Sequence, residues 1–308
     1  MDEQGLSRRR RWWRPKLVPL FLGLVTASMG LGSVTAGGQA VSAPVRPAAS
    51  AAAAPGEHAV SALKADGGWG EPIFVEDFNG SALDLRRWFT YNTPNIEPKR
   101  DPALIRVTQG ELQLVGSVNA EGKEVGSGLA TTFGQMYGRW EVRFRVDRGA
   151  GYGPAILLWP DGDGQWPRDG EIDLMEIPKQ NREWGTTVAH NGSPNGRGGY
   201  RDRSRSQRVN ADFTQWHTVA VDWLPNRLTF YFDGKKVWTV TPATKPYQGG
   251  NQNLVPSTSP MRLALQLDEC SHNAPLYGPD WIPCRNKQTP PEVLLHIDWV
   301  KVWKMPGA

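Results

Sequence analysis

The stretch Trp140-Glu141-Val142-Arg143-Phe144-Arg145-Val146 alternates apolar and charged residues without interruption. Successive side chains of a β-strand point to opposite faces, so a period of two predicts a strand with one buried face and one polar face. Trp140 belongs to the apolar set and is expected in the core. This stretch therefore predicts one strand of a sheet that packs on a second layer.

The same alternation recurs along the chain, and the sequence shows no long apolar run with helical periodicity. The 308 residues include 34 glycines and 25 prolines, which suits the many turns of a β-sandwich. Asp233-Gly234 is a dipeptide typical of tight hairpin turns. We therefore expect an all-β fold in which Trp223 and Trp299 also face the core and whose further strands are Thr218–Trp223, Leu228–Phe232, Lys236–Val240, Met261–Leu267 and Val293–Trp303.

The positive charge of the chain is concentrated at its N-terminus. Residues 1–43 carry six basic and two acidic side chains, a surplus equal to the net charge of +4 of the whole chain. The remaining residues are neutral overall and offer no cationic footprint for DNA or RNA. We therefore expect no nucleic-acid partner.

Residues 1–43 have the parts of an export signal: a cationic stretch up to Lys16, an apolar run from Leu17 to about Val34, and small residues ending at Ala43. We expect a secreted, extracellular protein without stable membrane association after cleavage. The alternative is an uncleaved N-terminal anchor on the outer face of the membrane. Residues 44–68 form an Ala/Pro-rich linker too poor in apolar side chains to fold, and residues 69–308 form a single domain.

Three acidic residues interrupt an otherwise apolar segment, Glu171-Ile172-Asp173-Leu174-Met175-Glu176-Ile177. Glu171 and Asp173 are two residues apart and share a face, whereas Glu176 would point into the core of a regular strand. An unpaired carboxylate there is costly. One extra residue at Leu174-Met175, a β-bulge, returns Glu176 to the acidic face, so the sequence predicts a bulge.

Carboxylates that share a face disfavour each other's charged forms, so some of their pKa values must rise. A protonated acid beside an ionised nucleophile is what glycoside hydrolysis requires near neutral pH. A tight carboxylate cluster could instead bind a metal ion. Nearby tryptophans favour a sugar, because flat apolar rings stack on the C–H faces of pyranoses. The expected platforms, each with core packing as the alternative, are Trp159, Trp166 and Trp184.

Residues 170–176, Gly-Glu-Ile-Asp-Leu-Met-Glu, resemble the E-x-D-x-x-E motif of glycoside hydrolase family 16, in the six-residue form typical of its laminarinase-like members. The resemblance extends over nearly all of residues 69–308. Several ordered blocks are more specific than the acidic motif alone, and the further ones are Glu76–Gly80 with Trp88, Gly138–Arg143, Gly153–Ala155, Trp216–Trp223, Tyr231–Gly234 and Ile297–Val302.

The resemblance implies a β-jelly-roll sandwich of two curved antiparallel sheets, with a polysaccharide bound in a cleft along the concave one. It also implies a retaining double displacement that requires no cofactor. Glu171 would be the nucleophile, Glu176 the acid and then the base, and Asp173 the residue that holds and tunes the nucleophile. Retention requires outer carboxylates about 5–5.5 Å apart.

Other residues are assigned to substrate binding by their position. The resemblance places His190 beside the cleft, where it can hydrogen-bond a sugar hydroxyl; a structural histidine is the alternative. Asn92 and Tyr91 are expected to shape the non-reducing side. Arg139 and Arg143 could reach the cleft, or be ordinary surface charges.

Two further expectations concern stability. The resemblance implies a structural calcium ion on the convex side, held by the Asp298 side chain and by backbone carbonyls near Asp77 and Gly110. The alternative is an Asp298 that pairs within the sheet. In an oxidising setting we expect Cys270 and Cys284 to form a disulfide, with two free buried thiols as the alternative.

Together these observations predict a secreted, monomeric, retaining endo-glycosidase that hydrolyses β-1,3-glucan of the laminarin type or mixed-linkage β-glucan. One alternative keeps the site and changes the reaction, to transglycosylation or to hydrolysis of agarose, carrageenan or xyloglucan. The other is a non-catalytic glucan-binding protein, which the presence of both outer glutamates disfavours.

Overall fold

The computed structural model describes residues 68–307, except residues 94, 96–97, 163 and 271–280. The expected export signal in residues 1–43 and nearly all of the expected linker in residues 44–68 lie outside the described residues. Among the residues that are described, no helix is long and apolar enough to cross a membrane.

Antiparallel strands make up about half of the described residues, which also contain one 3-10 helix, η3 (Pro102–Leu104). The first sheet consists of β1 (Phe74–Glu76), β3 (Ile105–Thr108), β4 (Glu111–Val118), β5 (Glu124–Val125), β7 (Gly138–Val146), β12 (His217–Leu224), β13 (Arg227–Phe232), β14 (Lys235–Val240) and β16 (Val293–Trp303). The second sheet consists of β2 (Trp88–Thr90), β6 (Ser127–Thr131), β8 (Tyr152–Pro160), β9 (Glu171–Glu176), β10 (Trp184–Pro194), β11 (Tyr200–Asn210) and β15 (Met261–Glu269).

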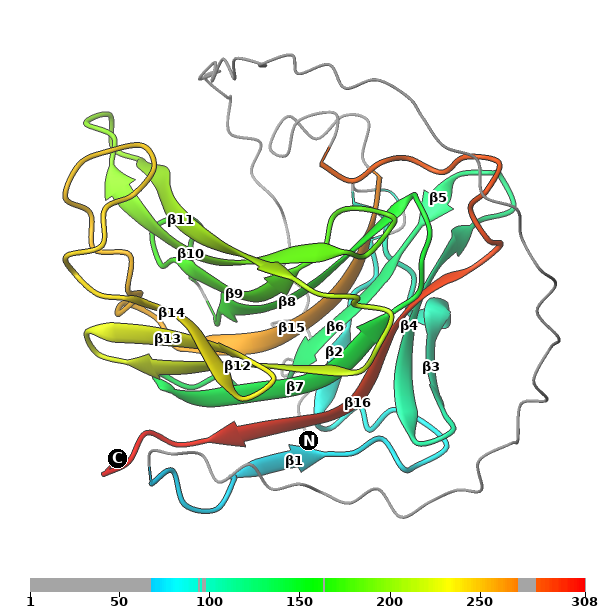
Figure 1. Ribbon diagram of the computed structural model, residues 1–308, viewed down its shortest axis with the longest axis horizontal. Coiled ribbons are helices and arrows are strands. Elements are labelled where there is room, and N and C mark those ends of the chain that lie inside the picture. Colours follow the sequence, from blue (N-terminus) through cyan, green and yellow to red (C-terminus); the bar gives the residue numbers. More distant parts are fainter. Residues whose placement is uncertain (1–67, 94, 96–97, 163, 271–280, 308) are drawn as a thin grey trace, which may run out of the picture. The chain divides into compact units, whose positions relative to one another are not determined.

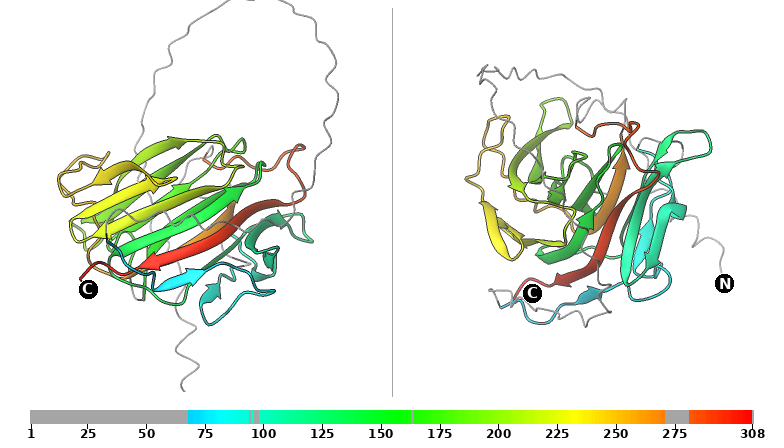
Figure 2. Two further views of the ribbon diagram at one scale, coloured as in Figure 1. Left: turned by 60° about the horizontal axis from the view of Figure 1, so that its bottom comes forward. Right: turned by 45° about the vertical axis from the view of Figure 1, so that its right-hand side comes forward.

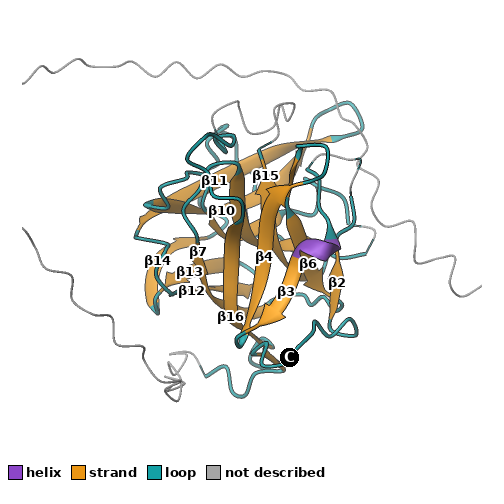
Figure 3. Cartoon of the chain, turned by 90° about the vertical axis from the view of Figure 1, so that its right-hand side faces the viewer, coloured by secondary structure: helices purple, strands orange, loops and turns teal. Residues whose placement is uncertain are grey.

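The two sheets stack face to face, and both are curved (Figure 1). The first has the order β14-β13-β12-β7-β16-β4-β3, with β1 beside β16 and β5 beside β4. The second has the order β11-β10-β9-β8-β15-β6-β2, and its hollow side faces away from the first sheet (Figure 1). Figure 2 shows β1 running along β16, and Figure 3 shows β16, β4 and β3 as neighbours at one side of the sandwich. The predicted all-β jelly roll is confirmed.

The core lies between the sheets and is built from the apolar half of each alternating strand. In β7, Trp140, Val142, Phe144 and Val146 are at most 1% exposed, as the alternation predicts. Strand β9 contributes its apolar residues to the same cluster. The β13–β14 hairpin turns at Asp233-Gly234, where both residues have positive φ.

Strand β16 departs from the prediction. Its register against β7 shifts between Ile297 and Trp299, so that Trp299 lies opposite Arg143 instead of a core residue. Trp299 is only half-buried, with the ammonium group of Lys301 4.5 Å above its ring. The prediction that Trp299 faces the core is wrong, because the extra residue Asp298 reverses the alternation beyond it.

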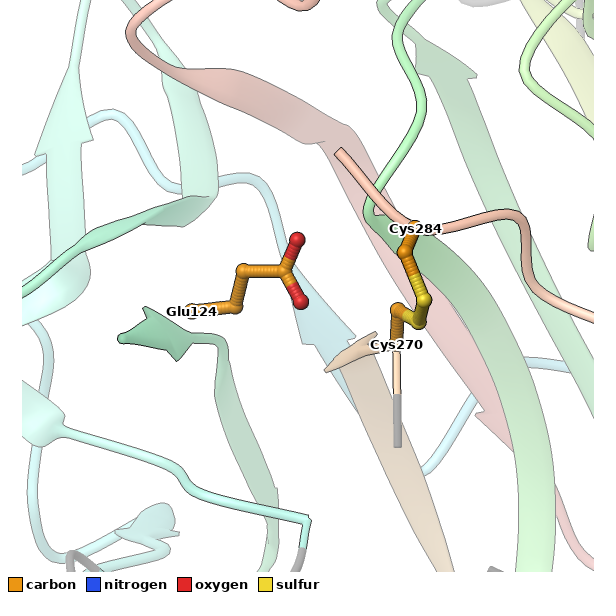
Figure 4. Close-up of side chains that lie close together, drawn as sticks. All are labelled: Glu124, Cys270 and Cys284. Carbon is orange, nitrogen blue, oxygen red and sulfur yellow. A yellow bond between two sulfur atoms is a disulfide. The ribbon is translucent and has the colours of Figure 1, made fainter. Parts of the chain in front are cut away.

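Cys270, which follows β15, and Cys284 form a disulfide with a Cα–Cα distance of 5.0 Å (Figure 4). It closes a loop ahead of β16, as expected for an oxidising setting. Glu124 lies close to it and accepts a hydrogen bond from the backbone N–H of Arg285. The sulfur atoms are used in the disulfide, so this group offers no thiolate to a metal ion.

Candidate active site

The three acids lie on β9, which is flanked by β8 and β10 in the second sheet. Between Asp173 and Glu176 the register of β9 shifts by one residue against both neighbours, which is the predicted bulge. Leu174 and Met175 are both buried in the core at 1% exposure. The extra residue therefore turns all three acids to the hollow side, called the acidic face below. Their partners on β10 are His190 for Glu171, Val188 for Asp173 and Thr186 for Glu176.

Gly170 allows the chain to enter β9 at Glu171. Its φ is +80°, and a Cβ there would lie 2.8 Å from the carbonyl oxygen of His190 and 2.7 Å from Pro256. A side chain at this position would meet both a strained backbone and a closed space. Gly170 therefore allows the chain to turn into β9 immediately before Glu171, the candidate nucleophile.

The two outer acids are held partly protonated. Burial and the negative charge of Asp173 raise the pKa of Glu171 well above its ordinary value and raise the pKa of Glu176 to about 8. The indole N–H of Trp166 donates to Glu171 Oε2 at 2.8 Å and favours its ionised form. Among the described residues no side-chain donor contacts Glu176. The Trp166 hydrogen bond therefore stabilises the anion of Glu171, and Glu176 keeps a proton at neutral pH.

His190 lies between two carboxylates. Its Nε2 is 3.3 Å from Asp173 Oδ2, and its Nδ1 is 3.0 Å from Asp202 Oδ1. Burial would lower the pKa of His190, but Asp173, Asp202 and Glu171 together raise it well above its ordinary value. Groups of Glu171, Asp173 and His190 lie within 4.8 Å of one another, as in a metal site. A protonated imidazole has no lone pair to offer a metal ion, which disfavours that alternative.

Two of the three predicted sugar platforms lie beside Glu171. The rings of Trp159 and Trp166 stack with centroids 6.5 Å apart and 8° between their planes, and Trp166 is 37% exposed. Trp184 lies on the same face of β10 as His190, but toward Glu176. The guanidinium of Arg208 sits 4.5 Å above the ring of Trp184, so one of its faces is already covered.

The acidic face continues away from β9 on both sides. Toward β2, Leu157 opposite Asp173 and Ala155 opposite Glu176 belong to an apolar cluster that includes Tyr91. Beyond Glu171, a cavity of about 420 Å³ is lined by amide, hydroxyl and guanidinium groups. An extended surface with apolar patches and hydroxyl-binding groups suits a polymer of sugars.

The comparison with known protein families decides which family this fold and site represent. The model of the glycosyl hydrolases family 16 matches residues 90–300, which include both sheets' central strands and all three acids. The chain belongs to glycosyl hydrolase family 16.

Individual relatives agree with this assignment. The Beta-glucanase of Rhodothermus marinus is 35% identical over 120 residues, which cover 37% of this chain and 42% of that protein. The Keratan-sulfate endo-1,4-beta-galactosidase of Sphingobacterium multivorum is 29% identical over 177 residues, which cover 56% of this chain and 38% of that protein. The chain thus spans about two fifths of the length of each. The catalytic domain of an endo-1,3-beta-glucanase (laminarinase) from Thermotoga petrophila RKU-1 has the same fold, with a TM-score of 0.62 at 20% identity over 77% of this chain and 98% of that one.

The expectation that Arg139 reaches the acidic face of this family 16 domain is wrong. Arg139 lies on β7 in the first sheet, where alternate residues such as Trp140 fill the core and Arg139 points outward. It is 6% exposed and bonds Asp222 at 2.7 Å and Glu141 at 3.2 Å. Arg143 lies on the same outer face. The alternation in the sequence predicts which side chains of β7 face the core, but it does not predict to which of the two sheets the strand belongs.

Asn92 follows β2 at the far edge of the acidic sheet, with β6, β15 and β8 between it and β9. It is exposed. The structure therefore places Asn92 on the edge of the correct sheet without bringing it to the acids. Its role in binding the non-reducing side stays a prediction.

The residues of the predicted calcium site lie along one edge of β16. The last pair of β1 is Glu76 with Val300, and the register of β4 reaches Leu112 with Ile297, so Asp77 and Gly110 flank residues 298–299. The Asp298 carboxylate, however, forms an ion pair with Arg143 of β7. A calcium ion would have to compete with that guanidinium, and calcium binding here stays a prediction.

Asp202 is the residue of this site that sequence reasoning missed. It lies on β11 opposite Gly192, and its contact with His190 is diagonal across two strands. The segment around it, Tyr200-Arg201-Asp202-Arg203, has no apolar alternation to reveal its pairing. Only the register of the β10–β11 hairpin brings it to the acidic face.

Proposed function

We propose that this family 16 chain is a secreted, monomeric endo-glycosidase that hydrolyses β-1,3-glucan, of laminarin type or with mixed linkages, and retains the anomeric configuration. The observation that carries the proposal is the bulge of β9, which sets Glu171 and Glu176 on one face on either side of Asp173. Export is supported by the pattern of residues 1–43. No cofactor is needed for the reaction below.

The reaction begins with a sugar ring above Asp173. The ionised carboxylate of Glu171 attacks the anomeric carbon while the protonated carboxyl of Glu176 gives its proton to the departing glycosidic oxygen. The C–O bond to the leaving chain breaks, and a glycosyl ester of Glu171 forms. Glu176, now a carboxylate, takes a proton from water, whose oxygen displaces Glu171 from the opposite side. Two inversions restore the original configuration.

The hydrogen bond from Trp166 to Glu171 favours that division of roles. The indole N–H of Trp166 stabilises the anion of Glu171, whereas Glu176 has a pKa of about 8 and carries the proton at neutral pH. A general acid works best when its pKa is close to the working pH. Reversed roles would leave the protonated group beside the indole donor.

Glucan is favoured by the relatives named as glucanases and by the stacked pair of Trp159 and Trp166, which offers a flat apolar wall beside Glu171. One observation favours a different glycan. A relative acts on keratan sulfate, and the arginine-rich strand β11, with Arg208 on the acidic face, would suit an acidic substituent. A glycan carrying sulfate is therefore the second candidate substrate.

The test is the Glu171→Gln variant on purified polysaccharides: laminarin, mixed-linkage glucan, xyloglucan, agarose, carrageenan and keratan sulfate. Binding should survive, and hydrolysis should fall by about 10⁴-fold or more, as when other hydrolases lose a nucleophile. Glu183→Gln, an exposed glutamate outside the acidic face, is the matched control and should keep full activity. Hydrolysis that persists unchanged in Glu171→Gln contradicts the proposal. Sizing the products of the wild-type protein separates hydrolysis, which only shortens chains, from transglycosylation, which also lengthens some.

A further inference from the structure

We propose that Asp202 is a positioning residue of the acidic face: it keeps His190 cationic and aimed at Asp173, so that a positive charge stays beside the three acids of β9. This inference rests on the proposed glycosidase function. Asp202 is on β11, two strands away from β9, and it acts only through the imidazole of His190.

The geometry around His190 requires hydrogens on both ring nitrogens. Nδ1 contacts Oδ1 of Asp202 at 3.0 Å, and Nε2 lies 3.3 Å from Oδ2 of Asp173. A neutral imidazole would turn a lone pair toward one of these carboxylates, which is repulsive. The charged groups that act on His190 include Glu171, Asp173 and Glu176 from β9 and Asp202 from β11. The neutral indole of Trp166 lies with its ring centroid 6.5 Å from that of His190. All of these charges are negative, so the imidazolium is the stable form.

Asp173 needs this cation more than its neighbours do. It is 1% exposed, and its Oδ2 accepts no hydrogen bond within the described structure. The like charges of the three acids of β9 disfavour one another, and a positive charge beside them offsets that repulsion. The nearby charge of His190 supplies that compensation by an electrostatic contact. Without it, the pKa of Glu171 would rise further, and the nucleophile would be protonated more often.

Asp202 is placed to hold the imidazole and not to react. Its side chain is 27% exposed, whereas that of Asp173 is 2% exposed. Asp202 is therefore partly in contact with solvent, and it influences the buried acids only through the imidazole ring of His190 between them. The β10–β11 hairpin fixes the distance, because eleven residue pairs of that hairpin are in register.

The direct test is the titration of the His190 imidazole, followed by ¹⁵N NMR in the full-length protein. In the wild-type protein the ring should stay doubly protonated at neutral pH, because the surrounding carboxylates raise its pKa. In Asp202→Asn one carboxylate is lost, so the ring should titrate at lower pH. The matched control is Asp233→Asn, which removes the carboxylate 2.8 Å from Nδ1 of His217 in an exposed hairpin and should leave the His190 titration unchanged.

Kinetics provide the second readout. Above the lowered pKa of His190, kcat of Asp202→Asn should fall by roughly ten- to a hundredfold, the range seen for carboxylates that orient a functional histidine. KM should change little, and Asp202→Glu should restore much of kcat. A loss of the same size at every pH, without rescue by glutamate, would mean that Asp202 serves the fold alone and would overturn the inference.

The NMR result requires no turnover, so the two proposals fail separately. A neutral His190 in the wild-type protein at pH 7 overturns the inference even if Asp202→Asn does not fold. An unchanged activity of Glu171→Gln overturns the proposed function while the His190 titration can still be measured.

Discussion

The outer faces of both sheets carry acidic and basic side chains, but the acids are paired with basic side chains to different extents. On the first sheet each buried acid has a basic partner: Arg139 bonds Glu141 and Asp222, and Arg143 pairs with Asp298. On the acidic face of the second sheet, by contrast, Asp173 and Asp202 both contact one histidine, His190, and the guanidinium of Arg208 lies over Trp184.

The balance decides the direction of the pKa shifts. On the first sheet burial would raise the pKa of Glu111 and Asp147, but the hydrogen bonds and charges of His296 and Arg145 together outweigh it and lower both. On the acidic face burial and like charge act together, and the pKa values of Glu171 and Glu176 rise. Charges that are compensated stabilise the fold, whereas uncompensated ones hold protons that a reaction can use. Substitutions on the two faces should therefore separate activity from stability.

The largest effect is expected on the acidic face, from Glu176→Gln. This variant lacks the proton donor, so hydrolysis of glucan should fall by about 10²–10⁴-fold, while the midpoint of urea unfolding should hold or rise because a raised-pKa carboxylate is removed. Aryl glycosides with an acidic phenol as leaving group need no proton and should lose much less rate in the first step. Initial rates on both substrates check this. Equal losses on the two would show that Glu176 is not the acid.

The opposite outcome is expected on the first sheet, from Arg139→Ala. Removing a buried guanidinium leaves Glu141 and Asp222 without a cation, which should lower the free energy of unfolding by about 3–5 kcal/mol. Urea unfolding measures this, and kcat of the folded protein at low temperature should be unchanged. Arg86→Ala is the control, since Arg86 is exposed in its ion pair with Asp84 and should change stability little. A fall of kcat in folded Arg139→Ala would contradict the separation of the two faces.

The two bulges show how far the sequence could predict this molecule. In β9 the three acids allow only one favourable arrangement. A regular strand would bury Glu176 in the core at a high cost in free energy, so a bulge at Leu174 could be predicted. In β16 no such conflict is visible: Trp299 is as acceptable in a core as outside it. The bulge at Asp298 is set by pairing with β1, β4 and β7 at once, which alternation within one strand cannot reveal.

The same limit explains which site residues could be found. Glu171, Asp173 and Glu176 lie close together in sequence, so their shared face follows from strand geometry. Arg139 and Asp202 depend on which strands become neighbours, and that is decided by long-range packing. Arg139 was therefore expected in the cleft and is in the other sheet, whereas Asp202, for which the sequence offered no prediction, contacts His190.

The smallest change in stability is expected from a pH experiment on His296. Like His190 on the acidic face, this histidine lies between two carboxylates, so the two sites can be compared directly. It contacts Glu111 at 2.7 Å and Asp147 at 3.2 Å. Burial and Arg145 would lower its pKa, but these two acids raise it. A raised histidine pKa adds stability that is complete below the ordinary value of 6.5 and is lost as pH rises through the folded value. The lowered pKa values of Glu111 and Asp147 act in the opposite sense, and their contribution is lost as pH falls.

His296→Asn should therefore lower the free energy of unfolding most near pH 5–6, by about 1 kcal/mol once solvent screening is allowed for, and less at pH 9. Urea unfolding of both proteins across that range measures the difference. The activity of the folded variant should keep the wild-type pH profile, because His296 faces away from the acidic sheet, whereas removing the carboxylate partner of His190 should alter kcat. A difference in unfolding free energy that is constant with pH would mean that His296 contributes by packing alone, and the charge balance of the first sheet would then not be what stabilises it.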